Sequence, residues 1–195
     1  MATVLYAGLL SLVMGTAFVM SAWGAPPMAT QQGGPVTTVP SVDLDRYVGE
    51  WFEIARFPNR FQEKCAGEVK AAYARRPDGR IDVTNSCRTA DGAMTAARGV
   101  ARVVDQATRS KLKVRFAPAA LSFLPFVWGD YWIIGLDADY RWAVVGSPDR
   151  KYLWVLSRTA QLDQATFDQA LERARANGFD VSKLQRTKQA HGRSE

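Results

Sequence analysis

The sequence of 195 residues predicts an all-β domain, an eight-stranded up-and-down antiparallel β-barrel with one C-terminal α-helix packed on the outside. Three observations predict it. After Asp43, short segments of alternating apolar and polar residues follow one another, separated only by short turns. One amphipathic helical pattern follows the last of these segments. Eight such strands close around an interior that holds side chains or one small ligand. A two-sheet sandwich is the alternative, but it gives the lone helix no face to cover.

The amino-terminal 42 residues contain no charged side chain, and Val4 to Met20 is almost continuously apolar. The stretch ends in "SAWGAP", which fits the small-x-small pattern of a signal-peptidase site. We therefore expect residues 1–24 to be a signal peptide. An uncleaved membrane anchor is the alternative, because no Lys or Arg stands near Met1. Either segment would export the folded part. Residues 25–42 are rich in Pro, Gly and Thr and are expected to form a flexible leader before a folded domain at 43–187.

Strands are expected wherever apolar and polar residues alternate or a short apolar run lies between turn residues. The clearest alternation is at Leu112, Val114 and Phe116, and the Pro-Asp-Gly of "RPDGR" predicts a hairpin turn. The expected strands are 50–57, 67–75, 80–87, 93–104, 110–117, 130–137, 141–147 and 151–158. The last three are apolar on both faces, so something must pack on their outer side.

A helix from the N-cap Asp163 to the capping Gly178 provides that cover. Its apolar side carries Ala165, Phe167, Ala170, Leu171 and Ala174. Such a helix covers a few adjacent strands, which here are the late ones and, in a closed barrel, the first.

The helix cover also predicts which side chains of the first strand face outward and which face inward. Phe52 and Ile54 are expected on its outer side beneath the helix, while Trp51, Glu53 and Ala55 are expected to face inward.

The two cysteines test the barrel topology. Cys65 lies just before the second strand and Cys87 at the end of the third, so an up-and-down barrel brings both to the same rim. A disulfide there suits an oxidising compartment. Two free thiols are the alternative.

Most catalytic chemistry is missing from the sequence. The single histidine, His191, lies in the polar tail 188–195, which excludes Ser-His-Asp and Cys-His sites and clusters of histidine metal ligands. We expect no metal and no cofactor. The net charge of +6 comes from scattered basic residues, unlike the basic stripe of a nucleic-acid-binding protein. Glu53 remains as a carboxylate, but one buried carboxylate is more often structural than catalytic. A binding protein is the simpler hypothesis.

Three motifs together resemble a known family. "LDRYVGEWFEIARFPNRF" contains the Gly-x-Trp of Gly49 and Trp51, "SPDRKYLWVLSRT" contains Arg158, and "NGFDVSKL" follows the helix. In this order and spacing, residues 42–187 resemble a bacterial lipocalin of the apolipoprotein D type. The resemblance implies a cup whose floor is plugged by Trp51, with Arg158 packed across its indole. No cysteine follows the apolar amino terminus, so the sequence predicts no lipoprotein anchor, in contrast to well-known bacterial members.

The resemblance also implies a ligand site inside the cup. Strand alternation then assigns its inward-facing wall, for which plain core packing is the alternative: Tyr73, Val83, Asn85, Val114, Phe116, Tyr131, Ile133, Val145, Trp154 and Leu156. Such a lining suits a small hydrophobic ligand, and a fatty acid or lysophospholipid is the expected class.

The function implied is binding, storage or transport of this ligand in the cell envelope, without enzymatic activity. The protein is expected in the periplasm or at the outer membrane, as a monomer or weak homodimer. The alternative is a lipid-modifying isomerase or de-epoxidase that uses Glu53 or a free Cys65 or Cys87.

The segment 117–129 between the fifth and sixth strands is unusually apolar for a loop, with the sequence "APAALSFLPFVWG". At the open mouth of a cup it would serve as a lid, a dimer contact or a membrane-touching edge. We expect contact with a membrane surface.

Overall fold

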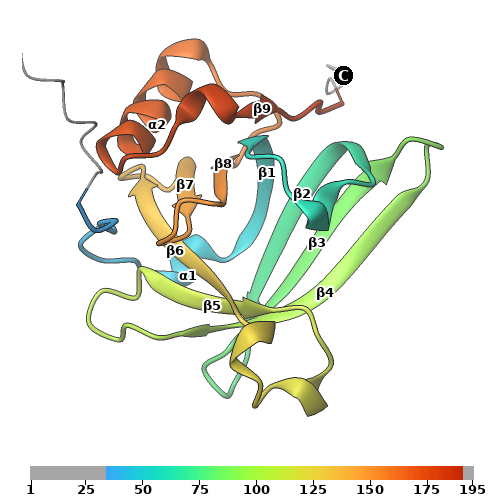
Figure 1. The fold of residues 1–195 in the computed structure, drawn as a ribbon, viewed down its shortest axis with the longest axis vertical. Helices are drawn as coiled ribbons and strands as arrows, with labels where there is room; N and C mark the ends of the chain where they lie inside the picture. The colour runs from blue at the N-terminus through green and yellow to red at the C-terminus, as the bar shows by residue number, and fades with distance from the viewer. Residues whose placement is uncertain (1–33, 191–195) are drawn as a thin grey trace, which may run out of the picture. The chain divides into compact units, whose positions relative to one another are not determined.

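A computed structural model describes residues 34–190 of the chain. The expected signal peptide or anchor at 1–24 lies outside the described residues, as does His191. Figure 1 shows one antiparallel sheet that curls into a barrel, with a helix against its outside. The strands follow the chain in order from β2 to β8, and β1 closes the barrel because it pairs with both β8 and β2. The predicted eight-stranded up-and-down barrel is therefore confirmed.

The strands have these bounds: β1 Gly49–Arg56, β2 Cys65–Arg75, β3 Ile81–Thr89, β4 Met94–Val103, β5 Lys111–Arg115, β6 Gly129–Leu136, β7 Trp142–Gly146 and β8 Leu153–Ser157, with a short extra strand β9 at Gln185–Arg186. The helices are α1 Leu44–Tyr47 and α2 Gln164–Ala176. Short 3-10 helices span Arg60–Gln62, Ala119–Leu121, Pro125–Val127 and Val181–Lys183. The sequence did not predict β9, because two polar residues carry no periodic signal.

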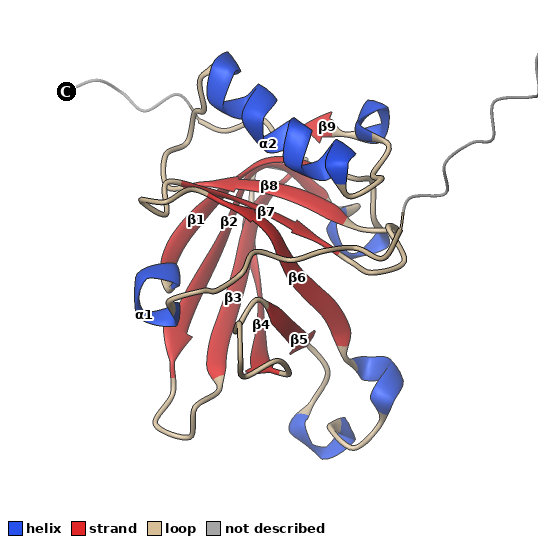
Figure 2. Cartoon of the chain, turned by 90° about the vertical axis from the view of Figure 1, so that its left-hand side faces the viewer, coloured by secondary structure: helices blue, strands red, loops and turns tan. Residues whose placement is uncertain are grey.

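The predicted carboxyl-terminal helix is present as α2, and it packs on β6 and β7 (Figure 2). Asp163 caps it by accepting a hydrogen bond from the amide of Thr166, and Gly178 follows its end with φ +76°. Phe167, Ala170 and Ala174 are its buried residues. Neither helix within residues 34–190 has the length and apolar character needed to cross a bilayer.

The wall of the barrel separates two apolar clusters, an inner cluster within the barrel and an outer cluster between the wall and α2. Alternate residues of β7 show the division, since Val145 belongs to the inner cluster and Val144 to the outer one. Ile54 lies in the outer cluster with Phe52 packed against it, and Trp51 lies in the inner one. The first strand thus places these three side chains as its alternation predicted.

A β-bulge changes the second half of β1. Glu53 pairs with Leu156, but the next pairs are Ala55 with Val155 and Arg56 with Trp154. The inward prediction for Ala55 is therefore wrong: this residue lies in the outer cluster. The extra residue shifts the alternation by one position, so Arg56 comes to the face that Ala55 would have occupied.

The folded part includes residues before Asp43, which corrects the expected flexible leader over its described residues 34–42; residues 25–33 of it lie outside the described part of the chain. Val36 and Val42 are buried, and the amide of Val42 donates to Thr108 O at 2.8 Å. The amide of Val39 donates to Ile133 O at 3.0 Å. Composition favoured a leader, but the valines recur every third residue and supply apolar side chains that the clusters bury.

The first residues of the predicted polar tail also belong to the fold. Lys188 O accepts a hydrogen bond from the amide of Glu68 at 2.7 Å, and the side chain of Gln189 donates to Glu53 O at 2.8 Å. The ordered chain therefore continues to at least residue 190.

Candidate ligand-binding site

The floor of the barrel is built around Trp51, which is fully buried. Its indole N–H donates to Tyr47 O at 2.8 Å, so α1 closes the end of the barrel where β1 begins. Arg158 follows β8, and its Cζ lies 3.8 Å from the centroid of the indole ring. The guanidinium on an aromatic face gains cation–π and stacking energy. The stacking that the family resemblance implied is present.

Arg158 also ties the closed end together. Its guanidinium donates to backbone carbonyls on α1, on the residue that follows it, on β1 and on the turn between β6 and β7: Arg46 O at 2.7 Å, Val48 O at 3.0 Å, Glu50 O at 2.8 Å and Tyr140 O at 3.3 Å. The planar fork of five donors makes Arg the side chain that fits such a set of acceptors.

Gly49 is needed at this contact for two reasons. Its φ of +97° lies in the region that glycine adopts without strain, and an added Cβ would stand 3.3 Å from Arg158 Nη1. The glycine of the Gly-x-Trp motif therefore allows the turn into β1 and leaves room for the guanidinium of Arg158.

Three tyrosine hydroxyls meet above the floor. The hydroxyl oxygen of Tyr131 lies 2.7 Å from that of Tyr47 and 3.0 Å from that of Tyr73. Burial raises the pKa of Tyr73 to about 12, and burial likewise raises the pKa of Tyr47 and of Tyr131. The cluster is therefore neutral at physiological pH. It places polar hydroxyls in an otherwise apolar interior.

Most of the predicted wall residues lie in or against the inner cluster. Its buried members include Tyr73, Val83, Ile133, Val145 and Leu156, and the partly buried side chains packed against it include Val114, Tyr131 and Trp154. The structure thus brings eight of the ten residues together, because strand alternation fixes the face on which each one lies. Their role in binding a ligand remains a prediction.

Phe116 and Asn85 are the two predicted wall residues outside that cluster. Phe116 is 43% exposed, and its ring lies so close to Gly99 that a Cβ there would stand 2.8 Å from Cδ1. Gly99 pairs with the inward-facing Val83, so Phe116 covers the inner face of β4 toward the mouth.

Asn85 lies on the inner face of β3, between Ala71 of β2 and Ala97 of β4. Its side-chain oxygen is buried and has no hydrogen-bond partner among the described residues. A buried carbonyl without a donor loses the hydrogen bonds it made to water, so a ligand group that donates to it would be favoured.

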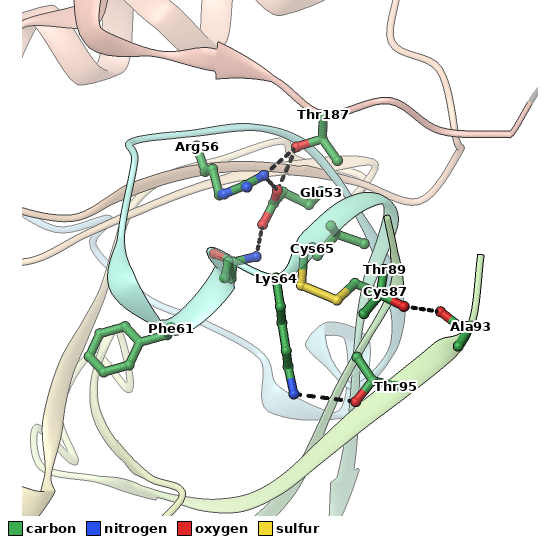
Figure 3. The surroundings of a disulfide bond; sticks show 12 residues. Glu53, Arg56, Phe61, Lys64, Cys65, Cys87, Thr89, Ala93, Thr95 and Thr187 are labelled. Carbon is green, nitrogen blue, oxygen red and sulfur yellow. Dashed lines mark hydrogen bonds and ion pairs between the residues drawn. A yellow bond between two sulfur atoms is a disulfide. The ribbon is translucent and has the colours of Figure 1, made fainter. Parts of the chain in front are cut away.

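The mouth end of β1 carries a polar network centred on Glu53, which is 3% exposed. Its carboxylate accepts hydrogen bonds from Arg56 Nη1 at 2.9 Å and Gln62 Nε2 at 2.6 Å, and from the hydroxyl of Thr187. Figure 3 shows Glu53 between Arg56 and Thr187. Gln62 Oε1 also accepts from the indole N–H of Trp154 at 3.0 Å. The loop after β1 is thereby bound to β1 and to β8.

Cys65 and Cys87 form the predicted disulfide, with their Cα atoms 5.6 Å apart. It joins the start of β2 to the end of β3 beside the Glu53 network (Figure 3). Neither cysteine is free, so the alternative of a catalytic thiol is wrong. Within residues 34–190, no three His, Cys, Asp or Glu side chains are grouped to hold a metal ion.

The loop between β5 and β6 exposes large apolar side chains. Phe123 is 76% exposed and Phe126 is 80% exposed. Trp128 is only partly exposed, because its ring lies 4.4 Å from the guanidinium carbon of Arg102 and 5.3 Å from that of Arg115. Trp128 therefore attaches the loop to the barrel, while the two phenylalanines project from it.

Sequence reasoning missed Tyr47, Arg56 and Gln62 as site residues. Tyr47 could have been identified from the sequence, since it stands four residues before Trp51 in the same motif. Arg56 depends on the bulge in β1, and Gln62 on the path of the following loop. Neither feature leaves a periodic pattern in the sequence.

Comparison with family models matches residues 42–189 to a lipocalin-like domain. Among curated proteins, temperature-induced lipocalin-1 of Arabidopsis thaliana is 43% identical over 154 residues, which are 78% of this chain and 82% of that protein. The outer membrane lipoprotein Blc of Escherichia coli K12 is 43% identical over 150 residues, covering 76% of this chain and 80% of the relative. Mouse apolipoprotein D is 27% identical over 193 residues, covering 95% and 92%.

Solved structures show the same fold at lower identity. Insecticyanin from the tobacco hornworm Manduca sexta superposes with a TM-score of 0.62 at 21% identity, covering 82% of this chain and 87% of that one. Apocrustacyanin C1 superposes with a TM-score of 0.61 at 15% identity, covering 77% and 81%.

Proposed function

The chain belongs to the lipocalin family, and on that basis we propose that it binds and carries a fatty acid or a lysophospholipid within its barrel. The observation that supports this most directly is the tyrosine cluster in an apolar interior. Three hydroxyls carry three protons, but only two hydrogen bonds join Tyr47, Tyr131 and Tyr73. One proton is left to donate to a ligand oxygen.

Asn85 supplies the complementary group. Val83 lies opposite Tyr73, and Asn85 follows two residues later on the same face of β3, roughly 7 Å further toward the mouth. A ligand group between the tyrosine cluster and Asn85 can accept a hydrogen bond from a tyrosine hydroxyl and donate one to the unpartnered side-chain oxygen of Asn85. A carboxylic acid or a hydroxyl satisfies both, and its alkyl chain then contacts the apolar wall, with about 0.8 kcal/mol gained for each buried methylene.

Fluorescence titration tests this proposal by comparing a long-chain fatty acid with an apolar naphthylamine dye that lacks the acid group. Asn85→Leu should weaken fatty-acid binding about fivefold to tenfold, the value of one hydrogen bond, and leave dye binding nearly unchanged. Tyr152→Phe, at the mouth, is the control. Equal losses for both ligands, or no fatty-acid binding by the unmodified protein, would contradict the proposal. Mass spectrometry of an organic extract identifies the ligand carried in cells.

We propose that the protein is a carrier and not an isomerase or de-epoxidase. Both cysteines are joined in the disulfide, and the carboxylate of Glu53 is engaged by Arg56, Gln62 and Thr187. Glu53→Gln keeps the shape of this network and removes its charge. Turnover of a lipid epoxide by the unmodified protein, lost in Glu53→Gln, would support the enzyme instead.

We also propose membrane contact through residues 117–129, which the exposed side chains of Phe123 and Phe126 support. The guanidinium of the exposed Arg102 lies at the base of the same loop, against Trp128, and favours an anionic lipid surface, whereas Arg115 on the same ring is buried. The double substitution of Phe123 and Phe126 by Ser should reduce binding to vesicles that contain an anionic phospholipid. Phe61→Ser removes a ring that is 61% exposed on a different loop and serves as the control. Unchanged vesicle binding and lipid uptake in the double variant would exclude this contact.

We propose the cell envelope as the location. Support comes from the similarity to Blc, which is named an outer membrane lipoprotein, although no cysteine follows the apolar amino terminus here. Fractionation of the source cells, with amino-terminal sequencing of the isolated protein, tests both the location and cleavage after the apolar segment. Recovery in the cytosol with residues 1–24 retained would contradict this location. Sedimentation velocity measures whether the protein is a monomer or a weak homodimer.

A further inference from the structure

The seam between β1 and β2 is only partly closed by strand pairing. The two strands pair from Gly49 opposite Tyr73 to Phe52 opposite Lys70, and the pairing ends there. Beyond this point β1 pairs with β9 instead, at Ala55 and Arg56. Toward the mouth, the wall of the barrel is therefore completed by the carboxyl-terminal chain.

Residues 187–190, which we call the strap, lie in the open part of this seam. On the β1 side, the amide of Thr187 donates to Ile54 O at 3.0 Å. On the β2 side, the amide of Glu68 donates to Lys188 O at 2.7 Å. The side chain of Gln189 joins both strands, since its Nε2 donates to Glu53 O at 2.8 Å and to Val69 O at 2.9 Å. One amide group thus bridges two strands that no longer bond to each other.

β2 is shaped to receive the strap. At Gly67, an added Cβ would stand 2.6 Å from Lys188 O, so the backbone approach excludes any side chain at this position. Glu68 has a φ of +50°, in the left-handed region that is unfavourable for a residue with a side chain. The irregular register between Gly67 and Lys70 accompanies this turn of the backbone.

The strap is held almost wholly by polar contacts near the surface. None of residues 187–190 is buried, and Ala190 is the only apolar one. The preceding residue is anchored much better, because the guanidinium carbon of Arg186 lies 3.4 Å from the ring centroid of Phe167 on α2. Segments with few buried apolar contacts open at lower free energy than the strands around them. The chain therefore has a natural hinge between Arg186 and Thr187.

A polar cleft of about 490 Å³ lies on the mouth side of the same seam. Its lining includes Arg56 of β1, Cys65 at the start of β2 and Gln185 of β9. The Nε of Arg56 is buried and has no partner among the described residues, so it offers a donor to a ligand oxygen. The disulfide holds the start of β2 on β3, which confines any separation to the β1–β2 seam.

We propose that the strap closes a lateral entrance to the barrel, through which an amphiphile enters between β1 and β2, its polar head meeting the cleft beside Arg56 before it reaches Asn85 and the tyrosine cluster. This rests on the proposed lipid-binding function. Release of the strap frees the backbone of β1 and β2 and removes Thr187 and Gln189 from Glu53.

Gly67→Ala tests the entrance, because the added methyl displaces the strap from outside the barrel. Gly129→Ala is the matched control: it also adds a methyl at the mouth end of a strand, but at 3.8 Å from the nearest atom.

A second variant ends the chain at Arg186, and its control ends at Ala190. Stopped-flow fluorescence with a dansyl-labelled undecanoic acid should show uptake and release both accelerated about tenfold in Gly67→Ala and in the chain ending at Arg186, the effect of losing one or two hydrogen bonds. A gate changes the rates of uptake and release by the same factor, and the Kd is the ratio of these rates. The Kd should therefore change less than threefold. A structural defect would raise the release rate alone.

Hydrogen exchange tests whether the strap opens, independently of whether the protein carries a ligand. In the unmodified protein, the amides of Glu68 and Thr187 should exchange at least about a hundredfold faster than that of Ile133, which donates to Ser110 O within the barrel wall. Exchange of all three at one slow rate would overturn the opening of the strap. Fast exchange with unchanged uptake rates in both strap variants would overturn the entrance. If the unmodified protein does not bind the probe, the carrier function fails, while the exchange rates still decide whether the strap opens.

Discussion

Arg158 and Trp51 lie at the closed end of the barrel with the guanidinium carbon 3.8 Å from the centroid of the indole ring, and the same guanidinium reaches Glu50 O at 2.8 Å and Arg46 O at 2.7 Å. One side chain therefore covers the buried indole and fixes the path of the backbone around it. The contact joins the end of the barrel's last strand to the beginning of its first.

Replacement of Arg158 by Lys should destabilise the protein despite retaining the positive charge. Lysine lacks the planar fork that stacks on the ring and bonds several carbonyls at once, so the free energy of unfolding should fall by about 2–3 kcal/mol. Arg175→Lys is the control, since Arg175 forms an exposed ion pair with Glu172 on α2. Urea unfolding measures both variants. Equal effects in the two would show that the stacked geometry contributes nothing.

A comparison of two glycines separates backbone strain from the contact with Arg158. Both Gly49 and Gly79 have positive φ, at +97° and +78°, but only at Gly49 would an added Cβ meet another residue. Gly79→Ala should cost about 1–2 kcal/mol from strain. Gly49→Ala should cost more, and the excess should disappear in an Arg158→Ala background. A cost for Gly49→Ala that stays the same in that background would assign all of it to the backbone.

Alkaline pH should weaken the fold through the tyrosine cluster. The pKa of Tyr73 is about 12 in the folded protein and 10.0 without the fold. Above pH 10 the unfolded chain loses this proton while the folded one keeps it. Stability should therefore fall by about 1.4 kcal/mol per pH unit for this hydroxyl until pH 12.

Tyr73→Phe provides the check on that pH dependence. Near pH 7 the variant should be less stable by about 1 kcal/mol, because the bond to Tyr131 is lost. As pH rises from 10 to 12 the difference should shrink and then reverse, since phenylalanine has no proton to lose. Urea unfolding at several pH values measures this crossover. Parallel curves for the two proteins would refute the assignment.

Loss of the disulfide should destabilise the mouth without abolishing the barrel. The two cysteines are 22 residues apart, and closure of a loop of this length is worth about 3 kcal/mol in chain entropy. The double variant Cys65→Ala, Cys87→Ala should therefore remain folded with a lower Tm. Thiol titration of the unmodified protein under native conditions should detect no free thiol. One reactive thiol per chain would contradict the structure.

The alternation of apolar residues predicted the barrel and most of its inner wall because each strand repeats a local pattern. Val83 and Val145 could be placed inside from their neighbours alone, and Asp163 and Gly178 marked the helix. A bulge leaves no such pattern. The extra residue in β1 reversed the expected faces of Ala55 and Arg56, and sequence alternation could not show it.

The hydrogen-bond partners of Glu53 also could not be predicted from the sequence. Thr187 lies 134 residues away along the chain, and Gln62 reaches the carboxylate only through the path of its loop. Long-range polar contacts are specified by the assembled fold and not by local periodicity. The early start of the fold at Val36 was missed for another reason, since the Pro, Gly and Thr content outweighed three regularly spaced valines.

The position of the strap at the end of the chain also determines the order in which the barrel can be completed. Synthesis delivers the polypeptide from its amino terminus, so β1 and β2 are available before Thr187 and Gln189, which join them. Until those residues arrive, the part of the seam beyond the pair Phe52 and Lys70 is unpaired. The nascent protein is thus an incompletely closed barrel, and the open part of the seam exposes it to aggregation until Thr187 and Gln189 fold into place.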